Sequence, residues 1–245
     1  MPAFGNPCNS GVRVATIAIN PAQSEFFNNG TPKIKTTRLP MLVDYAKACR
    51  VDLGPSELKD ARERRDYYFC DAQKNPRSFY HPWFDPLENI LLGLCFGWSY
   101  FNATAIHFDL VACATRQPWR YVPNPAQEVL QLNCRQYFQE TLSQLPEGTI
   151  LLSNGVEPKD IPVDVEFSCE VVELKDLPPL SVWQGSLSRY GNRILGWKPS
   201  ISSLWPNLWP EQKAPFLQWL RQHCHSQIRS GSGRQPETAG PAQFS

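Results

Sequence analysis

The stretch "VATIAINPAQSEFF", from Val14 to Phe27, is the part of the sequence that decides the fold. It begins as an apolar run rich in β-branched residues, which is typical of a strand buried on both faces. The run ends at Asn20-Pro21, and small or polar residues and then an aromatic pair follow. We therefore expect a buried strand that leads into a loop where an amide, a fixed proline and a small side chain lie together.

Apolar runs of this kind recur along the chain and alternate with helical patterns. Strands are expected at residues 12–19, 103–114, 148–153, 169–174 and 193–197. Helices are expected at residues 39–51, 56–69, 87–100 and 125–145. Nearly continuous apolar strands that alternate with helices are typical of parallel sheets covered on both faces. The sequence therefore predicts an α/β fold: a three-layer α/β/α sandwich with a central, mostly parallel sheet.

Length and composition favour one large domain. The chain has 245 residues, 42% of them hydrophobic, which is enough for a full core. We expect a single α/β domain over residues 1–225, with an insertion at about residues 30–86 that would serve as a lid, and a disordered tail over residues 226–245. No signal peptide and no apolar run of membrane-spanning length stand out, so the expected location is the cytoplasm, without membrane association.

The eight cysteines are widely spaced, and no pair has the C-x-x-C spacing. Zinc ribbons, iron–sulfur proteins and zinc deaminases use closely spaced thiolates, so these classes are disfavoured. The "HCH" triplet at residues 223–225 is a poor chelate on a helix, because adjacent side chains point in different directions. We expect neither a metal nor a cofactor.

The residues that follow the expected strands carry the candidate chemistry. Ligands of open parallel sheets bind where the strands end. The segments in question read "NPAQSEFF" (residues 20–27), "DLVACATRQPW" (109–119), "NGVEP" (154–158) and "KPSISS" (198–203). The parallel arrangement would gather these segments at one edge of the sheet.

Three of these motifs, taken together, resemble the uracil-DNA glycosylase superfamily. "INPAQ" at residues 19–23 resembles its water-positioning loop, which reads G-I-N-P-G in the mismatch-specific branch. "FDLVACATR" at 108–116 resembles the strand that reads the base, and "KPSISS" resembles the final H-P-S-P-L-S loop. The resemblance implies a DNA glycosylase: a hydrolase that binds duplex DNA, flips out one base, hydrolyses its N-glycosidic bond and leaves an abasic site.

The resemblance also implies roles for individual residues. Asn20 would orient the attacking water, and Lys198 would stabilise charge on the departing base in place of the family's histidine. The candidates for substrate binding are Pro21, Ala22, Phe26, Asp109 and Asn154. The candidates for DNA binding are Lys33, Lys35, Arg116, Ser200 and Ser202. Alternatives remain for several of them: Asn20-Pro21 as a simple strand end, Lys198 as a phosphate contact, and Phe26 as a core aromatic.

Two departures from the family pattern bear on the substrate. Ala22 stands where the uracil-specific branch has a tyrosine that excludes 5-substituted pyrimidines, and Asp109 stands where uracil enzymes have an asparagine. An ionised carboxylate only accepts hydrogen bonds, which suits the amino group of cytosine. The pair favours cytosine with a bulky 5-substituent, as in hypermodified bacteriophage DNA, and hence an antiviral role. The alternative is that Asp109 is protonated, or paired with His107 or Arg116 as scaffold.

Local charge supports a nucleic-acid partner, although the formal net charge is only +1. Residues 186–234 hold seven Lys or Arg residues against one acid, and "TPKIKTTRLP" adds three more basic residues. Residues 147–176 carry eight acids and would face away from DNA. Two other functions remain open: a repair glycosylase for uracil or thymine mismatches, and an inactive module that only binds modified DNA.

Overall fold

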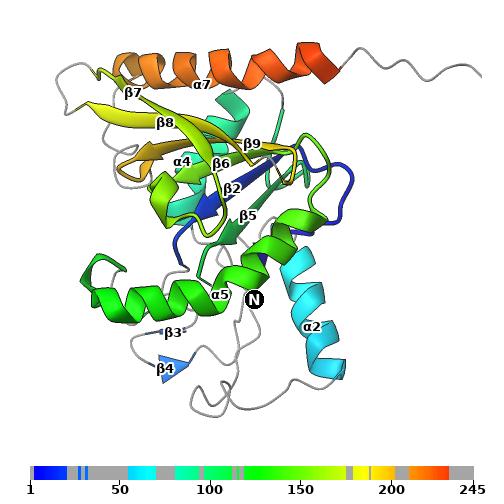
Figure 1. The fold of residues 1–245 in the computed structure, drawn as a ribbon. Coiled ribbons are helices and arrows are strands. Elements are labelled where there is room, and N and C mark those ends of the chain that lie inside the picture. Colours follow the sequence, from blue (N-terminus) through cyan, green and yellow to red (C-terminus); the bar gives the residue numbers. More distant parts are fainter. Residues whose placement is uncertain are drawn as a thin grey trace, which may run out of the picture.

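The structure is a computed structural model of the whole chain (Figure 1). It describes residues 3–20, 27–28, 31–32, 55–69, 81–93, 97–111, 115, 119–174, 179–187, 189–201 and 210–231. The expected helix at residues 39–51 lies outside the described residues, as does much of the insertion at 30–86.

A seven-stranded mixed sheet, in the order β1-β5-β2-β6-β9-β8-β7, forms the centre of the molecule. Its strands are β1 (Ala3–Phe4), β2 (Val14–Ala18), β5 (Ala105–Asp109), β6 (Ile150–Asn154), β7 (Glu166–Val172), β8 (Leu180–Leu187) and β9 (Asn192–Lys198). The four adjacent strands β5, β2, β6 and β9 are parallel, whereas β1 is antiparallel to β5, and β8 is antiparallel to both β9 and β7. A separate pair is formed by β3 (Phe27–Asn28) and β4 (Thr31–Pro32).

The apolar runs of the sequence form the inner strands because both faces of the sheet are covered. All residues of β2, β5 and β6 are buried. Side chains alternate between the faces of a strand, so each of these strands contributes to two separate cores. The prediction of a mixed α/β protein with a partly parallel sheet is confirmed.

Different helices contribute to the two cores. The helices are α2 (Pro55–Asp66), α4 (His81–Gly93), α5 (Asn124–Gln144) and α7 (Pro210–Gly231), with short 3₁₀ turns η3 (Trp119–Tyr121) and η4 (Pro158–Asp160). One core contains Leu87 and Leu91 of α4 and Phe216 of α7, whereas the other contains Phe138 and Leu142 of α5. Figure 1 shows α5 and α7 on opposite sides of the sheet.

The helix expected at residues 125–145 is confirmed as α5, and the apolar side of this helix points inward. Cys134, Phe138 and Leu142 are buried along one side, one turn apart. The helix begins beside Pro123 and Pro125, where a proline fits because its missing N–H would have no helical partner. This face covers the sheet residues Phe108 and Leu151.

Two expected elements differ from the structure. The apolar run at 169–174 predicts a buried parallel strand, but β7 is an edge strand, antiparallel to β8 and exposed from Glu166 to Val171. The helix expected at 87–100 begins earlier, as α4 at His81, and that helix ends at Gly93. Residues 98–104 instead turn around Glu88, whose carboxylate accepts hydrogen bonds from Ser99 Oγ and from the Tyr100 N–H.

The C-terminal helix α7 was not among the helices expected from the sequence. The tail was expected to be disordered from Ser226, but α7 continues to Gly231. None of the described helices is both long and apolar enough to cross a membrane.

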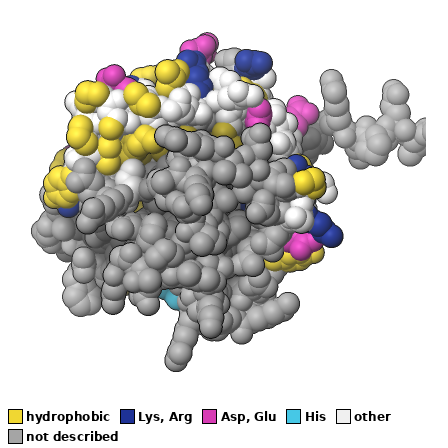
Figure 2. All heavy atoms as spheres, turned by 90° about the horizontal axis from the view of Figure 1, so that it is seen from below, with side chains coloured by type: hydrophobic (Ala, Val, Ile, Leu, Met, Phe, Trp, Pro, Cys, Tyr) yellow, Lys and Arg dark blue, Asp and Glu magenta, His cyan; other side chains and the backbone are white. Residues whose placement is uncertain are grey.

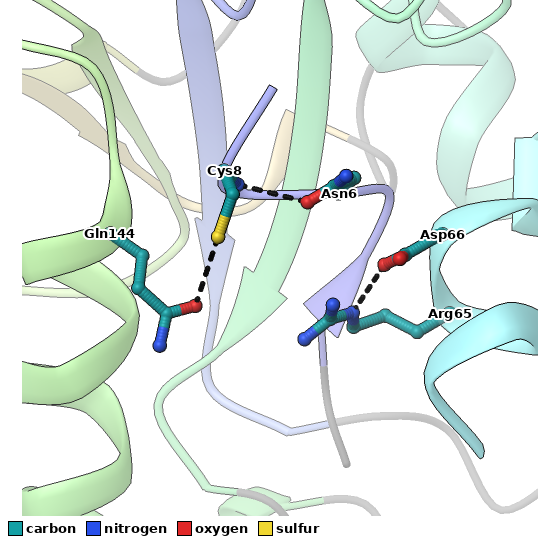
Figure 3. Close-up of polar contacts among 5 residues, drawn as sticks. All are labelled: Asn6, Cys8, Arg65, Asp66 and Gln144. Carbon is teal, nitrogen blue, oxygen red and sulfur yellow. Dashed lines mark hydrogen bonds and ion pairs between the residues drawn. The ribbon is translucent and has the colours of Figure 1, made fainter. Parts of the chain in front are cut away.

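The N-terminal segment ties together two helices that lie on different sides of it (Figure 3). Cys8 Sγ lies 3.7 Å from Gln144 Oε1 at the end of α5, and the Gly5 N–H donates to the Arg65 carbonyl of α2 at 2.8 Å. Arg65 Nε in turn donates to Asp66 Oδ1 at 2.7 Å. The segment that leads into β2 is thereby fixed between α5 and α2.

Candidate functional site

Four of the expected site residues lie where the inner strands end. Asp109 and Asn154 are the last residues of β5 and β6, Lys198 is the last residue of β9, and Asn20 follows β2. The carboxyl ends of parallel strands meet at one edge of a sheet. In Figure 1 the arrowheads of β2 and β5 accordingly point the same way. The structure thus brings these residues to a common edge.

Backbone hydrogen bonds hold the ends of β2 and β5 together. Ala18 pairs with Asp109 in the strand register. Beyond that pair, the Leu110 N–H donates to the Ala18 carbonyl at 2.9 Å and the Val111 N–H donates to the Ile19 carbonyl at 2.7 Å. The parallel ladder therefore extends past the strand ends and fixes the backbone on both sides of the site.

Asp109 is a buried carboxylate, with a side chain that is only 2% exposed. Its Oδ1 lies 3.5 Å from His107 Nε2, while its Oδ2 is buried and has no hydrogen-bond partner among the described residues. Burial raises the pKa of Asp109 above its ordinary value of 3.8, and the hydrogen bond and charge of His107 oppose that rise. One carboxylate oxygen is thus held by the protein, and the other retains its capacity to accept a hydrogen bond.

A chain of buried hydrogen bonds lies behind Asp109. His107 Nδ1 and Thr16 Oγ1 are 2.8 Å apart, and Thr16 Oγ1 and the Tyr100 hydroxyl are 2.5 Å apart. Burial raises the pKa of Tyr100 well above its ordinary value, so its hydroxyl stays protonated. Because Nδ1 is engaged by Thr16, the imidazole is held with Nε2 towards Asp109. We call this set the Tyr100–Thr16–His107 chain.

Aromatic rings surround His107 and fix its position. The ring centroids of Phe4, Trp83 and Phe84 lie 5.5, 6.2 and 5.1 Å from that of His107. Phe84 is 2% exposed and belongs to the core. These rings exclude water from His107, so its hydrogen bonds are made in a medium of low dielectric constant.

Asn20 is held by a residue from the loop after β5. Its Nδ2 donates to Thr115 Oγ1 at 3.0 Å, and its side chain is partly buried. This bond crosses from the end of β2 to the segment beyond β5. It restricts the rotation of the amide, which is a requirement for any residue that positions a water molecule.

Asn154 binds other parts of the protein. Its Oδ1 accepts hydrogen bonds from Trp197 Nε1 at 2.9 Å and from the Ile201 N–H at 2.8 Å. These two contacts tie the end of β6 to the end of β9 and to the loop that follows it. The side chain therefore ties the end of β6 to Trp197 and Ile201, and its expected contact with the substrate stays a prediction.

The "KPSISS" loop passes close to the turn after β6. A Cβ on Gly155 would lie 2.8 Å from Ser200 Cβ, and Gly155 has a φ of +78°. Both observations require glycine at this position. The Lys198–Pro199 peptide bond is cis. Ser200 thus lies against the backbone that follows Asn154.

Lys198 forms an ion pair at the edge of the site. Its Nζ contacts Glu157 Oε1, and Lys159 Nζ lies 2.7 Å from the other carboxylate oxygen. The hydrogen bonds from Lys159 and Lys198 lower the pKa of Glu157. The Lys198 side chain is 54% exposed, so a change of rotamer would release it from this contact at little cost.

The remaining expected site residues lie outside the described part of the chain. These are Pro21, Ala22, Phe26, Lys33, Lys35, Arg116 and Ser202. On the face drawn in Figure 2, the described Lys and Arg side chains are dispersed among acidic and apolar ones. Among the described residues, no three His, Cys, Asp or Glu side chains lie close enough together to hold a metal ion.

Several residues of the site were missed by sequence reasoning. Thr115, Thr16 and Tyr100 support Asn20 and His107, and Glu157 holds Lys198. Thr115 lies within "FDLVACATR", so its loop carried a signal. Tyr100 and Thr16 are 84 positions apart and no local pattern links them.

Comparisons of the sequence with protein-family models, with curated proteins and with solved structures found no match.

Proposed function

We propose that this protein is a DNA glycosylase that hydrolyses the N-glycosidic bond of a flipped-out, 5-modified cytosine and leaves an abasic site. The observation that carries the proposal is the buried carboxylate of Asp109, at the sheet edge that also holds Asn20. The proposal includes the three-layer sandwich of the uracil-DNA glycosylase superfamily, duplex DNA as the partner, and a role in defence against phage DNA.

The hydrogen-bonding capacity of Asp109 favours cytosine over uracil. Oδ2 lacks a partner among the described residues, and an ionised carboxylate is an acceptor only. The exocyclic amino group of cytosine would satisfy it, whereas the carbonyl of uracil or thymine would place two acceptors face to face. A buried acceptor left unpaired costs about 1–3 kcal/mol, so the correct base gains selectivity from this one contact.

Base release requires an attacking water and stabilisation of the departing base. The bond between the anomeric carbon and the base nitrogen breaks, the water oxygen bonds to that carbon, and the water proton leaves to solvent or to the base. Asn20, held by Thr115, would orient the water. The Lys198 ammonium group, once released from its ion pair with Glu157, would stabilise negative charge on the departing base. No covalent enzyme intermediate forms in this scheme.

The decisive experiment is to identify released bases by mass spectrometry from a panel of duplexes. The panel contains cytosine, 5-methylcytosine, 5-hydroxymethylcytosine, its glucosylated form, and uracil and thymine mismatches. We expect release of a 5-modified cytosine, with strand breaks only after alkali. Release of uracil or thymine alone would favour the repair function, and binding without any release would favour an inactive binding module.

A pair of variants tests the role of Asp109. Asp109→Asn removes a charged hydrogen bond and introduces a mismatched donor, which should reduce activity on the modified cytosine by about 2–4 kcal/mol, at least tenfold in rate. It should also raise activity on uracil. Glu88→Gln makes the same chemical change at another buried carboxylate and should leave base preference unchanged. An unmoved preference in Asp109→Asn would exclude Asp109 as the base reader.

A further inference from the structure

The two outermost strands of the central sheet, β1 and β7, differ in length and exposure. β1 is a two-residue strand and both its residues are buried, whereas β7 has seven residues and is exposed from Glu166 to Val171. In Figure 1, β7 lies at the outer end of the sheet, beyond β8. An exposed edge strand of this length presents backbone N–H and C=O groups to a further strand.

The two faces of β7 differ in chemistry. Phe167, Cys169 and Val171 lie on one face of β7, the face of Trp183, which pairs with Cys169; we call these three residues the β7 stripe. Phe167 and Val171 are 54% and 59% exposed, and Cys169 between them is an exposed free thiol. The other face carries Glu166 and Glu170. The stripe is therefore apolar surface that extends the buried face of the sheet to its outer edge.

We propose that β7 pairs with β7 of a second copy of this chain, antiparallel about a two-fold axis at Cys169, so that one continuous sheet crosses the dimer. This interface does not depend on the DNA chemistry proposed above. It follows from the residues that each possible register places opposite one another.

Charge selects the register. A two-fold pairing that keeps both stripes on one face of the joined sheet has its axis at a residue, because side chains alternate. An axis at Ser168 would place Glu166 opposite Glu170 twice, and an axis at Glu170 would place that residue opposite its own copy. Directly opposed like charges destabilise a strand pair. An axis at Cys169 avoids both arrangements, because Glu170 then lies opposite Ser168.

The same register matches the apolar residues. With the axis at Cys169, Phe167 of each copy lies opposite Val171 of the other, and Glu166 lies opposite Val172. Aromatic and β-branched residues are favourable cross-strand partners. The stripe of each copy would then cover that of the other across the axis. The sequence of β7 is thus complementary to itself.

Sedimentation or light scattering over about a hundredfold range of concentration tests the dimer. We expect the mass to rise from the 27.9 kDa of one chain towards twice that value. Val171→Lys changes both symmetry-related contacts, so the dissociation constant should rise at least about tenfold. The matched control is Leu132→Lys, the same kind of change at an exposed apolar residue of α5, and it should leave the dimer intact. A monomer at all concentrations, or a dimer that Val171→Lys does not weaken, would overturn the proposal.

Disulfide cross-linking tests the register. Directly opposed residues of antiparallel strands have Cα atoms about 4.5–5.5 Å apart, within the range a disulfide spans. Diamide would therefore oxidise the two Cys169 thiols to a disulfide and take up the two protons and two electrons released. The control variant Cys8→Ser, which removes another exposed thiol, should still form the covalent dimer. Cys169→Ser should form no covalent dimer, but its noncovalent dimer should persist. Peptide mapping that finds no Cys169–Cys169 link would refute this register.

Discussion

Replacing Asn154 with alanine tests whether this side chain orders the site loop. Asn154 Oδ1 accepts hydrogen bonds from Trp197 Nε1 and the Ile201 N–H, and Asn154 is 2% exposed. Asn154→Ala would leave two donors without a protein partner, at about 1–3 kcal/mol each. Allowing for water that enters the space, we expect a loss of about 2–4 kcal/mol in the free energy of unfolding. For a chain of this size, that corresponds to a Tm lower by about 4–16 °C.

The assay is thermal or urea unfolding monitored by circular dichroism, with Ser153→Ala as the control. Ser153 precedes Asn154, is fully buried, and makes one long hydrogen bond of 3.3 Å to the Val156 carbonyl. Its loss should cost less than about 1.5 kcal/mol. If Asn154→Ala retains wild-type stability to within about 1 kcal/mol, the two hydrogen bonds do not order the loop, and a direct role in substrate binding becomes the better explanation.

Three further predictions concern other contacts of the sheet and the site. Gly196→Ala should lower the free energy of unfolding by about 1–3 kcal/mol or more, measured by thermal unfolding, because the added Cβ would lie 2.1 Å from Trp183 Cε2. The loss should be smaller when Trp183 is replaced by phenylalanine, and an equal loss in that background would contradict the explanation. Burial raises the pKa of Asp109, so above that pKa the ionised carboxylate destabilises the folded state. The variant Asp109→Asn lacks this destabilisation, so its Tm should exceed that of the wild type at neutral pH, and the difference should shrink as the pH falls towards 3.8. A difference that does not change with pH would refute this. Lys198→Met should lower the rate of base release at least about tenfold, because it removes the positive charge that would stabilise the departing base. It should change the free energy of unfolding by less than about 1 kcal/mol, because the ion pair with Glu157 is largely exposed. Equal rates of base release in the variant and the wild type would exclude a role for Lys198 in the reaction.

The inner strands could be predicted from sequence because burial on both faces leaves a local signature. The runs at 12–19, 103–114 and 148–153 became β2, β5 and β6, although the second strand ends at Asp109. β8 was missed because Gln184, Gly185 and Ser186 break its apolar pattern. Gly185 has a specific cause, since a Cβ there would lie 2.5 Å from the Glu166 carbonyl oxygen of the neighbouring strand. Sequence alone does not reveal such contacts.

The edge strand β7 shows why exposure is harder to predict than strand formation. "CEVVEL" reads as apolar, but Glu170 lies on one face of β7 and Val171 on the other, and both are exposed. Topology predicts that the segments after the parallel strands meet at one end of the sheet, and Asn20, Asp109, Asn154 and Lys198 lie there; their roles rest on the resemblance and stay predictions. Their supporting partners depend on tertiary contacts between distant segments, so no local pattern indicates that Thr16 and Tyr100 belong to the same set of hydrogen bonds.

The Tyr100–Thr16–His107 chain has a consequence for how specificity would evolve under the proposed function. Within this set of residues, His107 contacts Asp109 through Oδ1, and an asparagine has an equivalent oxygen. An asparagine there would keep the contact with His107 and turn its NH₂ group to where Oδ2 now lies. Aspartate and asparagine codons differ by one nucleotide. A lineage with this support would change between reading an amino group and reading a carbonyl in one mutational step, without rebuilding the residues that hold the reader in place.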